Sequence, residues 1–361
     1  MTRILLTGGS GFIAAHVLDT LLERGHSVVT TVRSQAKGQR ILDAHPAVGK
    51  ERLDFVVVED IAQPNGNTYD PSSLHRFKSY YWARLTFEKA VISDPPFEAV
   101  IHTASPFHFR AVDARKELLA PAINGTTGIL HAIKKNAPSV KRVVVTSSLA
   151  AMFDVSKPGN YVYSEADWNP IKEDEVGKNP TFGYRGSKTF AERAAWDFIE
   201  KEKPGFTLAT CNPPLVLGPV VHYLASLDSI NTSNERISDL ITGKGKNSCP
   251  RTGTSLWVDV RDVALAHVLA AEKPEAANKR FFLTAGNFSN VEIVGIISDK
   301  FPELKDKLPS GEALVSGEVP PESLIGFDNS RSREVLGLTY RPLNVAVVDT
   351  VTSLQNLLRG D

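Results

Sequence analysis

Two residues that could together move a proton stand four positions apart in the string Y-R-G-S-K, namely Tyr184 and Lys188. On a helix this spacing places both side chains on one face. A phenol with a pKa of about 10 is a poor acid at neutral pH, and a nearby ammonium lowers that pKa by favouring the phenolate. The string opens an amphipathic helical pattern over 184–202. We therefore predict that Tyr184 and Lys188 form an acid–base pair.

Two further polar residues could assist that pair. Ser148 follows a predicted strand over 142–147, and its hydroxyl could hydrogen-bond a carbonyl and stabilise charge on its oxygen. A serine at a strand end can equally cap a turn. Asn124 falls inside a predicted helix over 111–136, where asparagine is a poor helix former, and Gly125 follows it. This combination predicts a local kink and a buried water site.

A glycine-rich turn near the start of the chain has the pattern T-G-x-x-G-x-x-A, between a strand pattern and an amphipathic helix. Gly8 would let the chain turn sharply with a positive φ. Gly11 would let a pyrophosphate approach backbone N–H groups at the helix N-terminus, where the helix dipole favours anions. A purely structural turn is the alternative interpretation. The nucleotide-binding interpretation assigns to the cofactor Thr7, Gly8, Ser10, Gly11, Phe12 and Ile13.

The end of the second predicted strand indicates which nucleotide this would be. Nicotinamide-binding folds that use NAD place an acidic residue there to hold the ribose hydroxyls. Here Arg33 stands at that point, and Lys37 and Arg40 follow it. Such a cationic cluster suits the 2′-phosphate of NADP, although Arg33 could also be a solvent-facing strand end. Asp60 and Ile61, after the third strand, are candidates to contact adenine, and Asp60 could equally cap a helix.

Short apolar runs alternate with helical patterns along much of the chain. Strands are predicted at 3–7, 27–33, 53–59, 99–103, 142–147, 207–212 and 280–284. Helices are predicted at 13–24, 34–45, 111–136, 184–202, 260–271 and 291–301. Continuous hydrophobic strands between helices indicate a parallel sheet covered on both faces. We therefore predict an α/β protein whose doubly wound parallel Rossmann sheet has about seven strands and binds ligands at their carboxyl ends.

The chain is expected to divide into two parts. Residues 1–212 plus 256–285 would form the NADP-binding Rossmann domain, and the Pro-, Gly- and Ser-rich segments 213–255 plus 286–342 a smaller substrate-binding lobe. A helix is predicted over 343–361, and 65–89 is an atypical insertion. Asp259 and Asp262 are assigned to structure, with Asp262 as a candidate helix cap.

Composition excludes several classes of function. The 361 residues carry no formal net charge, which argues against nucleic acid or an anionic membrane as the main partner. No apolar stretch approaches membrane-spanning length, and the chain opens on a strand pattern rather than a signal peptide. Two cysteines and no zinc motif suit a reducing compartment without metal. We expect a cytoplasmic monomer or homodimer that acts on a small molecule.

Taken together, these motifs resemble the extended short-chain dehydrogenases/reductases. The nearest branch holds dihydroflavonol 4-reductases, cinnamoyl-CoA reductases and fungal methylglyoxal/isovaleraldehyde carbonyl reductases. Strings similar to the fungal enzymes lie at 102–107, 124–131, 212–219 and 258–264, and the resemblance covers nearly the whole chain apart from 65–89.

The resemblance implies a role for each matching residue. Tyr184 would protonate the carbonyl oxygen, Ser148 would hold the carbonyl, and Lys188 would bind the nicotinamide ribose and lower the tyrosine pKa, with Asn124 helping to position it. Further cofactor contacts would come from Thr103, Ala104, Ser105 and Pro213. The implied reaction is reduction of an aldehyde or ketone to an alcohol by NADPH.

The substrate pocket is less well defined. By analogy its walls would include Phe107 and Phe153, which could equally be core aromatics. Leu215 stands where the fungal reductases often have tyrosine, which would leave a larger and less polar pocket. The chain also lacks the N-W-Y-C-Y-G-K string of the cinnamoyl-CoA reductases, which argues against an acyl-CoA substrate.

Three other functions are compatible with the same scaffold. A nucleotide-sugar epimerase or dehydratase usually keeps NAD tightly bound and has an acid where Arg33 stands. A 3β-hydroxysteroid-type dehydrogenase would run the same chemistry in the oxidative direction. A non-enzymatic NADP-sensing regulator would keep the glycine turn and lose the tyrosine, so the intact Tyr184–Lys188 pair argues against it.

Overall fold

The computed structural model describes residues 1–59, 87–105 and 113–359. These residues form two compact units. The first comprises 1–154, 165–212 and 267–281, and the second comprises 155–164, 213–266 and 282–361. The insertion predicted at 65–89 lies almost entirely outside the described residues.

The first unit is organised around a seven-stranded sheet within the described part of the chain. Its order is β10-β7-β5-β4-β1-β2-β3, and the neighbours from β3 through β1 to β7 pair in parallel. The strands are β1 (Arg3–Thr7), β2 (Ser27–Val32), β3 (Leu53–Val57), β4 (Ala99–His102), β5 (Arg142–Thr146), β7 (Thr207–Asn212) and β10 (Lys279–Phe282). Because the strand order reverses beside β1, the carboxyl ends of β1 and β4 form the switch point where such sheets bind ligands.

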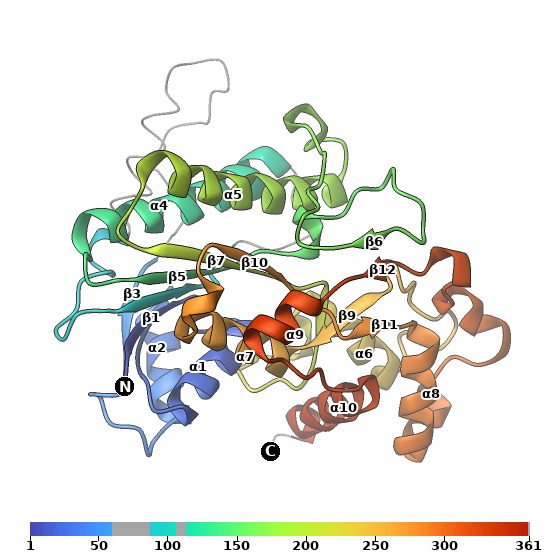
Figure 1. Cartoon of the computed structure of the whole chain (residues 1–361). Coiled ribbons are helices and arrows are strands. Elements are labelled where there is room, and N and C mark those ends of the chain that lie inside the picture. Colours follow the sequence, from blue (N-terminus) through green and yellow to red (C-terminus); the bar gives the residue numbers. More distant parts are fainter. Residues whose placement is uncertain (60–86, 106–112, 360–361) are drawn as a thin grey trace. The chain divides into compact units, whose positions relative to one another are not determined.

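Helices cover both faces of this sheet (Figure 1). The helices α1 (Phe12–Glu23) and α2 (Gln35–Ala44) lie on one side, and α4 (Ala120–Asn136) and α5 (Pro180–Glu202) lie on the other. The predicted doubly wound Rossmann fold is confirmed, and the seven predicted strands begin and end within two residues of the observed ones.

The core of the first unit explains why these runs become strands. Apolar side chains of the sheet are buried against apolar faces of α4 and α5, and burial of such side chains is the main force that stabilises the fold. The cluster includes Leu5, Val100, Val143, Leu208, Ile129, Ile133 and Phe198.

The helix predicted over 111–136 has an irregular start. Residues Arg115–Leu119 form a π-helical segment, and α4 then continues as a regular α-helix through Asn124 and Gly125. The predicted kink at Asn124 is therefore wrong, since the irregular turn precedes it. Pro121 explains part of this, because proline fits only in the first turn of an α-helix and favours a new start there.

The second unit contains small sheets and several helices. One sheet has the order β11-β9-β8 and another pairs β12 with β6 in parallel. The strands are β6 (Val162–Tyr163), β8 (Leu215–Leu217), β9 (Leu256–Asp259), β11 (Gly286–Asn287) and β12 (Gly326–Phe327). The helices are α6 (Thr232–Thr242), α8 (Asn290–Lys300), α9 (Ser330–Leu336) and α10 (Leu343–Arg359), and α7 (Val260–Glu272) is shared between the units.

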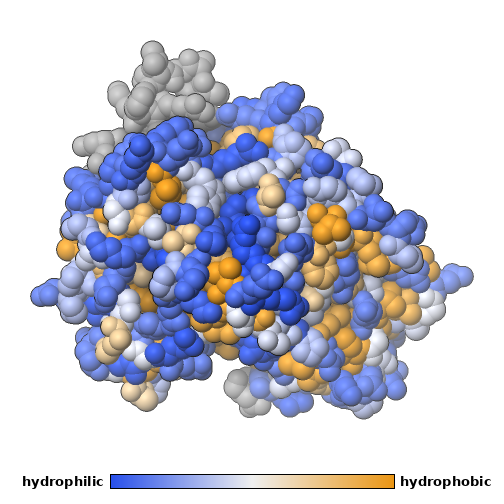
Figure 2. Space-filling view, in the orientation of Figure 1, coloured by the Kyte–Doolittle hydropathy of each residue, from blue (hydrophilic) through white to orange (hydrophobic). Residues whose placement is uncertain are grey.

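An apolar core of its own holds the second unit together. The cluster draws on α6, α8 and α10 and includes Ile237, Leu240, Ile293, Ile297, Val347 and Val351. On the face shown in Figure 2, hydrophobic residues gather in the right half of the view, over elements of this unit from β12 to α10.

The unit boundaries differ from the predicted ones at three places. Residues 256–266 and 282–285 group with the second unit rather than with the sheet, and 155–164 join it as well. The reason lies in strand pairing, since β9 pairs with β8 and β11, and β6 pairs with β12, instead of extending the central sheet. That the second unit binds the substrate stays a prediction.

The prediction that Asp262 caps a helix is also wrong. Asp259 caps α7, because its Oδ1 accepts a hydrogen bond from the backbone N–H of Arg261 at 2.8 Å. Asp262 is buried and forms an ion pair with Arg341 instead. A carboxylate buried this deeply needs a charged partner, which the cap position would not supply.

Candidate active site

Tyr184 and Ser148 meet at the carboxyl edge of the first unit's sheet. The helix α5 begins after Asn179, whose side chain accepts a hydrogen bond from the Phe182 N–H at 3.0 Å, and Pro180 starts its first turn. This start places Tyr184 in the second turn of the helix. Its hydroxyl donates to Ser148 Oγ, 3.2 Å away, just beyond the end of β5. The two residues predicted from separate motifs are therefore in direct contact.

The protonation of this pair is governed by burial. Burial raises the pKa of the Tyr184 hydroxyl above its usual value, and the hydrogen bond from Tyr184 to Ser148 opposes that rise. Burial also lowers the pKa of the Lys188 ammonium to about 8, and the Glu192 carboxylate opposes that fall. We expected the ammonium to make the phenol more acidic, but the pKa of Tyr184 moves upward, because removing a phenolate from water is unfavourable. A raised pKa keeps Tyr184 protonated at neutral pH, as a proton donor requires.

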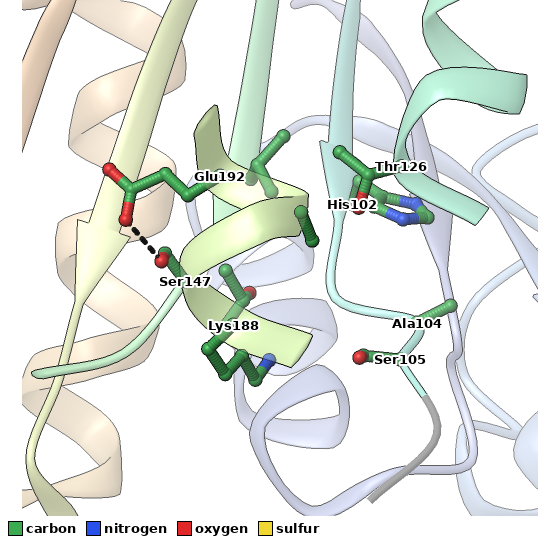
Figure 3. A pocket seen from close by; sticks show the side chains of 10 residues that line it. His102, Ala104, Ser105, Thr126, Ser147, Lys188 and Glu192 are labelled. Atoms are coloured by element: carbon green, nitrogen blue, oxygen red, sulfur yellow. Dashed lines mark hydrogen bonds between the residues drawn. The ribbon is translucent and has the colours of Figure 1, made fainter. Parts of the chain in front are cut away.

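A small pocket lies beside the turns of α5 that carry Lys188 and Glu192 (Figure 3). Its cavity volume is about 20 Å³. Residues from β4, α4, β5 and α5 line it, including His102, Ala104, Ser105, Thr126, Ser147, Lys188 and Glu192. The pocket thus joins Lys188 to Ala104 and Ser105, which had been predicted as cofactor contacts.

Asn124 and Thr126 stand on the α4 side of this region. Asn124 is buried, with 6% of its surface exposed, and Thr126 lines the pocket. The structure thus places Asn124 in the interior of α4, two residues from a pocket wall. Its help in positioning Lys188 stays a prediction.

The glycine turn has the predicted backbone form. Gly8 adopts φ +78°, a conformation that strongly favours glycine. A Cβ on Gly8 would also lie 3.0 Å from the Cα of Ala104, so the turn passes close to the end of β4. Gly11 is the N-cap of α1, where no side chain makes a capping hydrogen bond and the first turn holds no acid. The positive end of α1 is thus available to an anion, as a dinucleotide pyrophosphate requires.

Thr7 fixes the turn against the next strand. Its hydroxyl accepts from the Ala104 N–H at 3.2 Å and is hydrogen-bonded to Nδ1 of His102 at 2.8 Å. The Thr103 hydroxyl donates to the Thr7 carbonyl at 2.6 Å. Because these groups are engaged within the protein, we expect Thr7 and Thr103 to shape the cofactor site rather than to donate to the cofactor.

Three cations gather after β2, as the sequence indicated. Arg33 is exposed at the end of the strand. Burial lowers the pKa of Lys37, and the positive charges of Arg33 and Arg40 lower it further. Within the described residues neither Arg33 nor Lys37 forms an ion pair with an acidic side chain. Cations held close together suit a bound phosphate. That the pyrophosphate of NADP binds at α1 and its 2′-phosphate at Arg33 stays a prediction.

The remaining predicted residues are distributed as follows. Phe153 lies in the first unit, where the guanidinium of Arg185 stacks on its ring 5.0 Å from the centroid. Pro213 and Leu215 belong to the second unit. Asp60, Ile61 and Phe107 lie outside the described residues. Their contacts with cofactor or substrate stay predictions.

Sequence reasoning missed a buried polar network behind Ser148. Glu192 accepts from Ser147 Oγ at 2.5 Å and from Arg280 Nε at 2.7 Å, and Asn212 reaches both Glu192 and the Ser148 carbonyl. One signal was available, since Glu192 follows Lys188 by the same four residues that separate Lys188 from Tyr184. All three side chains therefore share one helix face.

Comparison with known proteins agrees with this geometry. The model of the NAD dependent epimerase/dehydratase family matches residues 4–283, most of the chain. The chain belongs to this family. Within the NAD dependent epimerase/dehydratase family, a ketoreductase of Aspergillus niger, azaE, is 44% identical over 355 residues, covering 98% of this chain and 97% of that protein. The predicted membership in the extended short-chain dehydrogenases/reductases is confirmed.

Two further relatives of this family are similar along nearly their whole length. The NADPH-dependent methylglyoxal reductase GRE2 of Saccharomyces cerevisiae is 33% identical, with 97% of each chain covered. The crystal structure of Gre2 in complex with NADPH from Candida albicans superposes with a TM-score of 0.82 at 36% identity, covering 99% of each chain. In the part of the chain that the structure describes, no helix is both long and apolar enough to span a bilayer.

Proposed function

We propose that this protein is an NADPH-dependent carbonyl reductase that converts an aldehyde or ketone into an alcohol. The observation that carries the proposal is the hydrogen bond from Tyr184 to Ser148, 3.2 Å long, on a helix that also carries Lys188 one turn away. Relatives named as a ketoreductase and as NADPH-dependent methylglyoxal reductases support the same reaction.

The protein's own groups would act on the carbonyl oxygen. The Ser148 hydroxyl donates a hydrogen bond to that oxygen, and the Tyr184 hydroxyl transfers its proton to it. Bound NADPH supplies the hydride that the carbonyl carbon receives. Lys188 remains cationic, which stabilises the phenolate left on Tyr184 until a proton from water restores it. The oxygen and carbon thus gain one proton and one hydride, which together make the alcohol.

Discrimination between the two nicotinamide cofactors would rest on Arg33 and Lys37. A guanidinium binds a phosphate through two parallel hydrogen bonds, and a second cation nearby strengthens the attraction. NADH lacks the 2′-phosphate, so it would leave both cations without that partner. We therefore infer a preference for NADPH over NADH.

The proposal is tested by following cofactor oxidation with a panel of carbonyl compounds. Purified protein is mixed with NADPH or with NADH, and with methylglyoxal, a branched aliphatic aldehyde or an aromatic ketone. We expect NADPH oxidation matched mole for mole by alcohol, and slower oxidation of NADH. Absence of NADPH oxidation with every carbonyl, together with NAD that copurifies with the protein, would instead favour an epimerase or dehydratase.

We further infer that the protein works in the cytosol as a monomer or homodimer whose partner is a small carbonyl compound. Its two cysteines, Cys211 and Cys249, are both buried as free thiols, which suits a reducing compartment. Cell fractionation and light scattering of the purified protein test these points. Recovery with membranes, or a larger assembly, would contradict them.

A further inference from the structure

We propose that Glu192 and Arg280 form a buried charge pair that positions Ser148 and tunes the acid–base behaviour of Tyr184 and Lys188. The inference rests on the proposed carbonyl reduction and adds two positioning residues to it. Neither residue belongs to the motifs that define the catalytic pair.

The Glu192 carboxylate is almost completely buried, and both of its oxygens accept hydrogen bonds. Its side chain is 1% exposed, and that of Arg280 is 8% exposed. Within the described residues, the Glu192 carboxylate accepts hydrogen bonds from Ser147 Oγ at 2.5 Å, Asn212 Nδ2 and Arg280 Nε at 2.7 Å, Thr210 Oγ1 at 3.1 Å and Trp196 Nε1 at 3.2 Å. A buried ion pair is often no more stabilising than apolar residues of the same volume. Stability alone therefore does not explain why charge is placed here.

Arg280 is held as firmly as its partner. Its guanidinium donates to the backbone carbonyls of Glu165 at 2.7 Å and Asp167 at 2.6 Å, and it stacks on the ring of Trp168, 3.9 Å from the centroid. Because α5 and β10 supply the two charges, the pair fixes the catalytic helix against the far edge of the sheet.

Two routes lead from this pair to the serine that contacts Tyr184. The first runs from Glu192 to the hydroxyl of Ser147, the residue before Ser148 (Figure 3). The second runs through Asn212, whose Nδ2 donates both to Glu192 and, at 3.3 Å, to the Ser148 carbonyl. Ser148 is therefore held through its neighbour and through its own backbone. Its hydroxyl also accepts a hydrogen bond from the Ala150 N–H at 3.1 Å, and these contacts together orient it toward Tyr184.

The same pair acts on Lys188 through charge. Glu192 lies one helical turn beyond Lys188 on α5, and both line the pocket of Figure 3. The carboxylate favours the ammonium form of Lys188. Because the Arg280 guanidinium is paired with that carboxylate, we infer from Coulomb's law that it offsets part of the effect. Removing the negative charge of Glu192 leaves the buried positive charge of Arg280 without its partner, and removing Arg280 leaves the buried negative charge of Glu192.

Two other titratable groups near the pair, His102 and Cys211, carry no charge at neutral pH. His102 of β4 has its pKa lowered to about 3 by burial, with a smaller contribution from Lys188, so its ring is neutral. Cys211 of β7 has its thiol pKa raised by burial and by Glu192, so it stays protonated. His267 of α7 is hydrogen-bonded to Thr146. Glu192 is the charged side chain that acts on Lys188 among the described residues, and Arg280 is its ion-pair partner.

The test is a pair of variants with opposite expected signs. With saturating NADPH, the rate of carbonyl reduction falls on the alkaline side as Lys188 and Tyr184 lose protons. Glu192→Gln removes a negative charge, favours deprotonation, and should move this alkaline limb to lower pH by about 0.5 to 1 unit. Arg280→Gln removes a positive charge and should move the limb to higher pH by a similar amount. A purely structural role would lower stability in both variants without opposite shifts.

Two conservative variants complete the design. Glu192→Asp keeps the charge and should return the limb to the wild-type position. Thr210→Val deletes a hydroxyl that is hydrogen-bonded to Glu192 and to Asn212 but removes no charge, so the alkaline limb of this variant should also stay in place. Limbs that coincide for Glu192→Gln, Arg280→Gln and the wild type would overturn the inference. If Glu192→Gln does not fold, the test rests on Arg280→Gln alone. An alkaline limb at higher pH than in the wild type would then support the inference, and an unshifted limb would overturn it.

The pH dependence of NADPH affinity provides a second readout that needs no turnover. The charge on Lys188 should control ribose binding, so the same opposite shifts are expected in fluorescence titrations. If the two variants show opposite shifts in the pH dependence of NADPH affinity but the wild-type protein reduces no carbonyl, only the proposed function is defeated. A wild-type protein that reduces carbonyls, with variants that show no shifts, would defeat the charge-pair inference alone.

Discussion

The carboxyl edge of the first unit's sheet is built differently at its two ends. At the nucleotide end, the turn between β1 and α1 offers backbone N–H groups, and its form depends on Gly8 and Gly11. At the catalytic end, side chains from α5, β5, β7 and β10 meet around Glu192. The first end depends mainly on the backbone form of one turn, which packs against the end of β4, whereas the second needs side chains from several elements to be packed correctly.

The difference indicates how each end should respond to change. A backbone site loses function when one residue distorts its turn, and hydrogen bonds to anions there are shared among several N–H groups. A side-chain site loses function when one reacting group is removed, because no neighbour can replace it. Substitutions at the two ends should therefore separate chemistry from cofactor binding.

The largest effect is expected from Tyr184→Phe, which removes the proposed proton donor while keeping the ring. General acid catalysis contributes on the order of 10² to 10⁴ in rate, so kcat should fall by about a thousandfold. NADPH affinity, measured by fluorescence, should change little, because the nucleotide end is untouched.

The matched control is Ser187→Ala on the same helix. Among the described residues the Ser187 hydroxyl donates to the Tyr184 backbone carbonyl alone, at 2.8 Å, so its loss leaves the phenol in place. This variant should keep kcat within a fewfold of the wild type. A Tyr184→Phe protein that turns over as fast as Ser187→Ala would remove Tyr184 from the chemistry.

Arg33→Asp should have the next largest effect, confined to the nucleotide end. A charged hydrogen bond contributes about 1.5 to 3 kcal/mol, so KM for NADPH should rise about 10- to 100-fold. The KM for NADH should fall or stay constant, since an acid at this point suits ribose hydroxyls. Steady-state kinetics with both cofactors measures the change in preference.

Lys50→Asp controls for the change in net charge, because Lys50 is an exposed cation of the same unit outside the cluster. Its cofactor preference should match that of the wild type. If Arg33→Asp also keeps the wild-type preference, the assignment of the 2′-phosphate to this cluster is wrong.

Features that depend on neighbouring residues were predictable from the sequence. The parallel strands follow from runs of apolar β-branched residues, and the positive φ of Gly8 follows from a turn between a strand and a helix. The meeting of Tyr184 with Ser148 also followed, because both stand at places that a doubly wound sheet brings to one edge.

Features that depend on long-range packing were not predictable. Glu192 and Arg280 are 88 residues apart, and nothing local marks them as partners. Asp262 had the residue type of a helix cap, but its partner Arg341 is 79 residues away and Asp259 caps α7 instead. The net rise in the pKa of Tyr184 was not predictable, because the depth of its burial cannot be read from spacing.

The smallest effect is expected from Gly8→Ala, compared with Gly25→Ala. Both glycines have positive φ, +78° and +86°, so each alanine should lower the free energy of unfolding by about 1 to 2 kcal/mol. Only at Gly8 would the new Cβ approach Ala104, because nothing lies within 4 Å of a Cβ at Gly25. We therefore expect Gly8→Ala alone to weaken NADPH binding, by about tenfold, or about 1.4 kcal/mol. Thermal unfolding and NADPH titration of both variants measure these effects. Equal NADPH affinity in the two variants would mean that the turn tolerates a side chain, and that the contrast between a backbone end and a side-chain end is overstated.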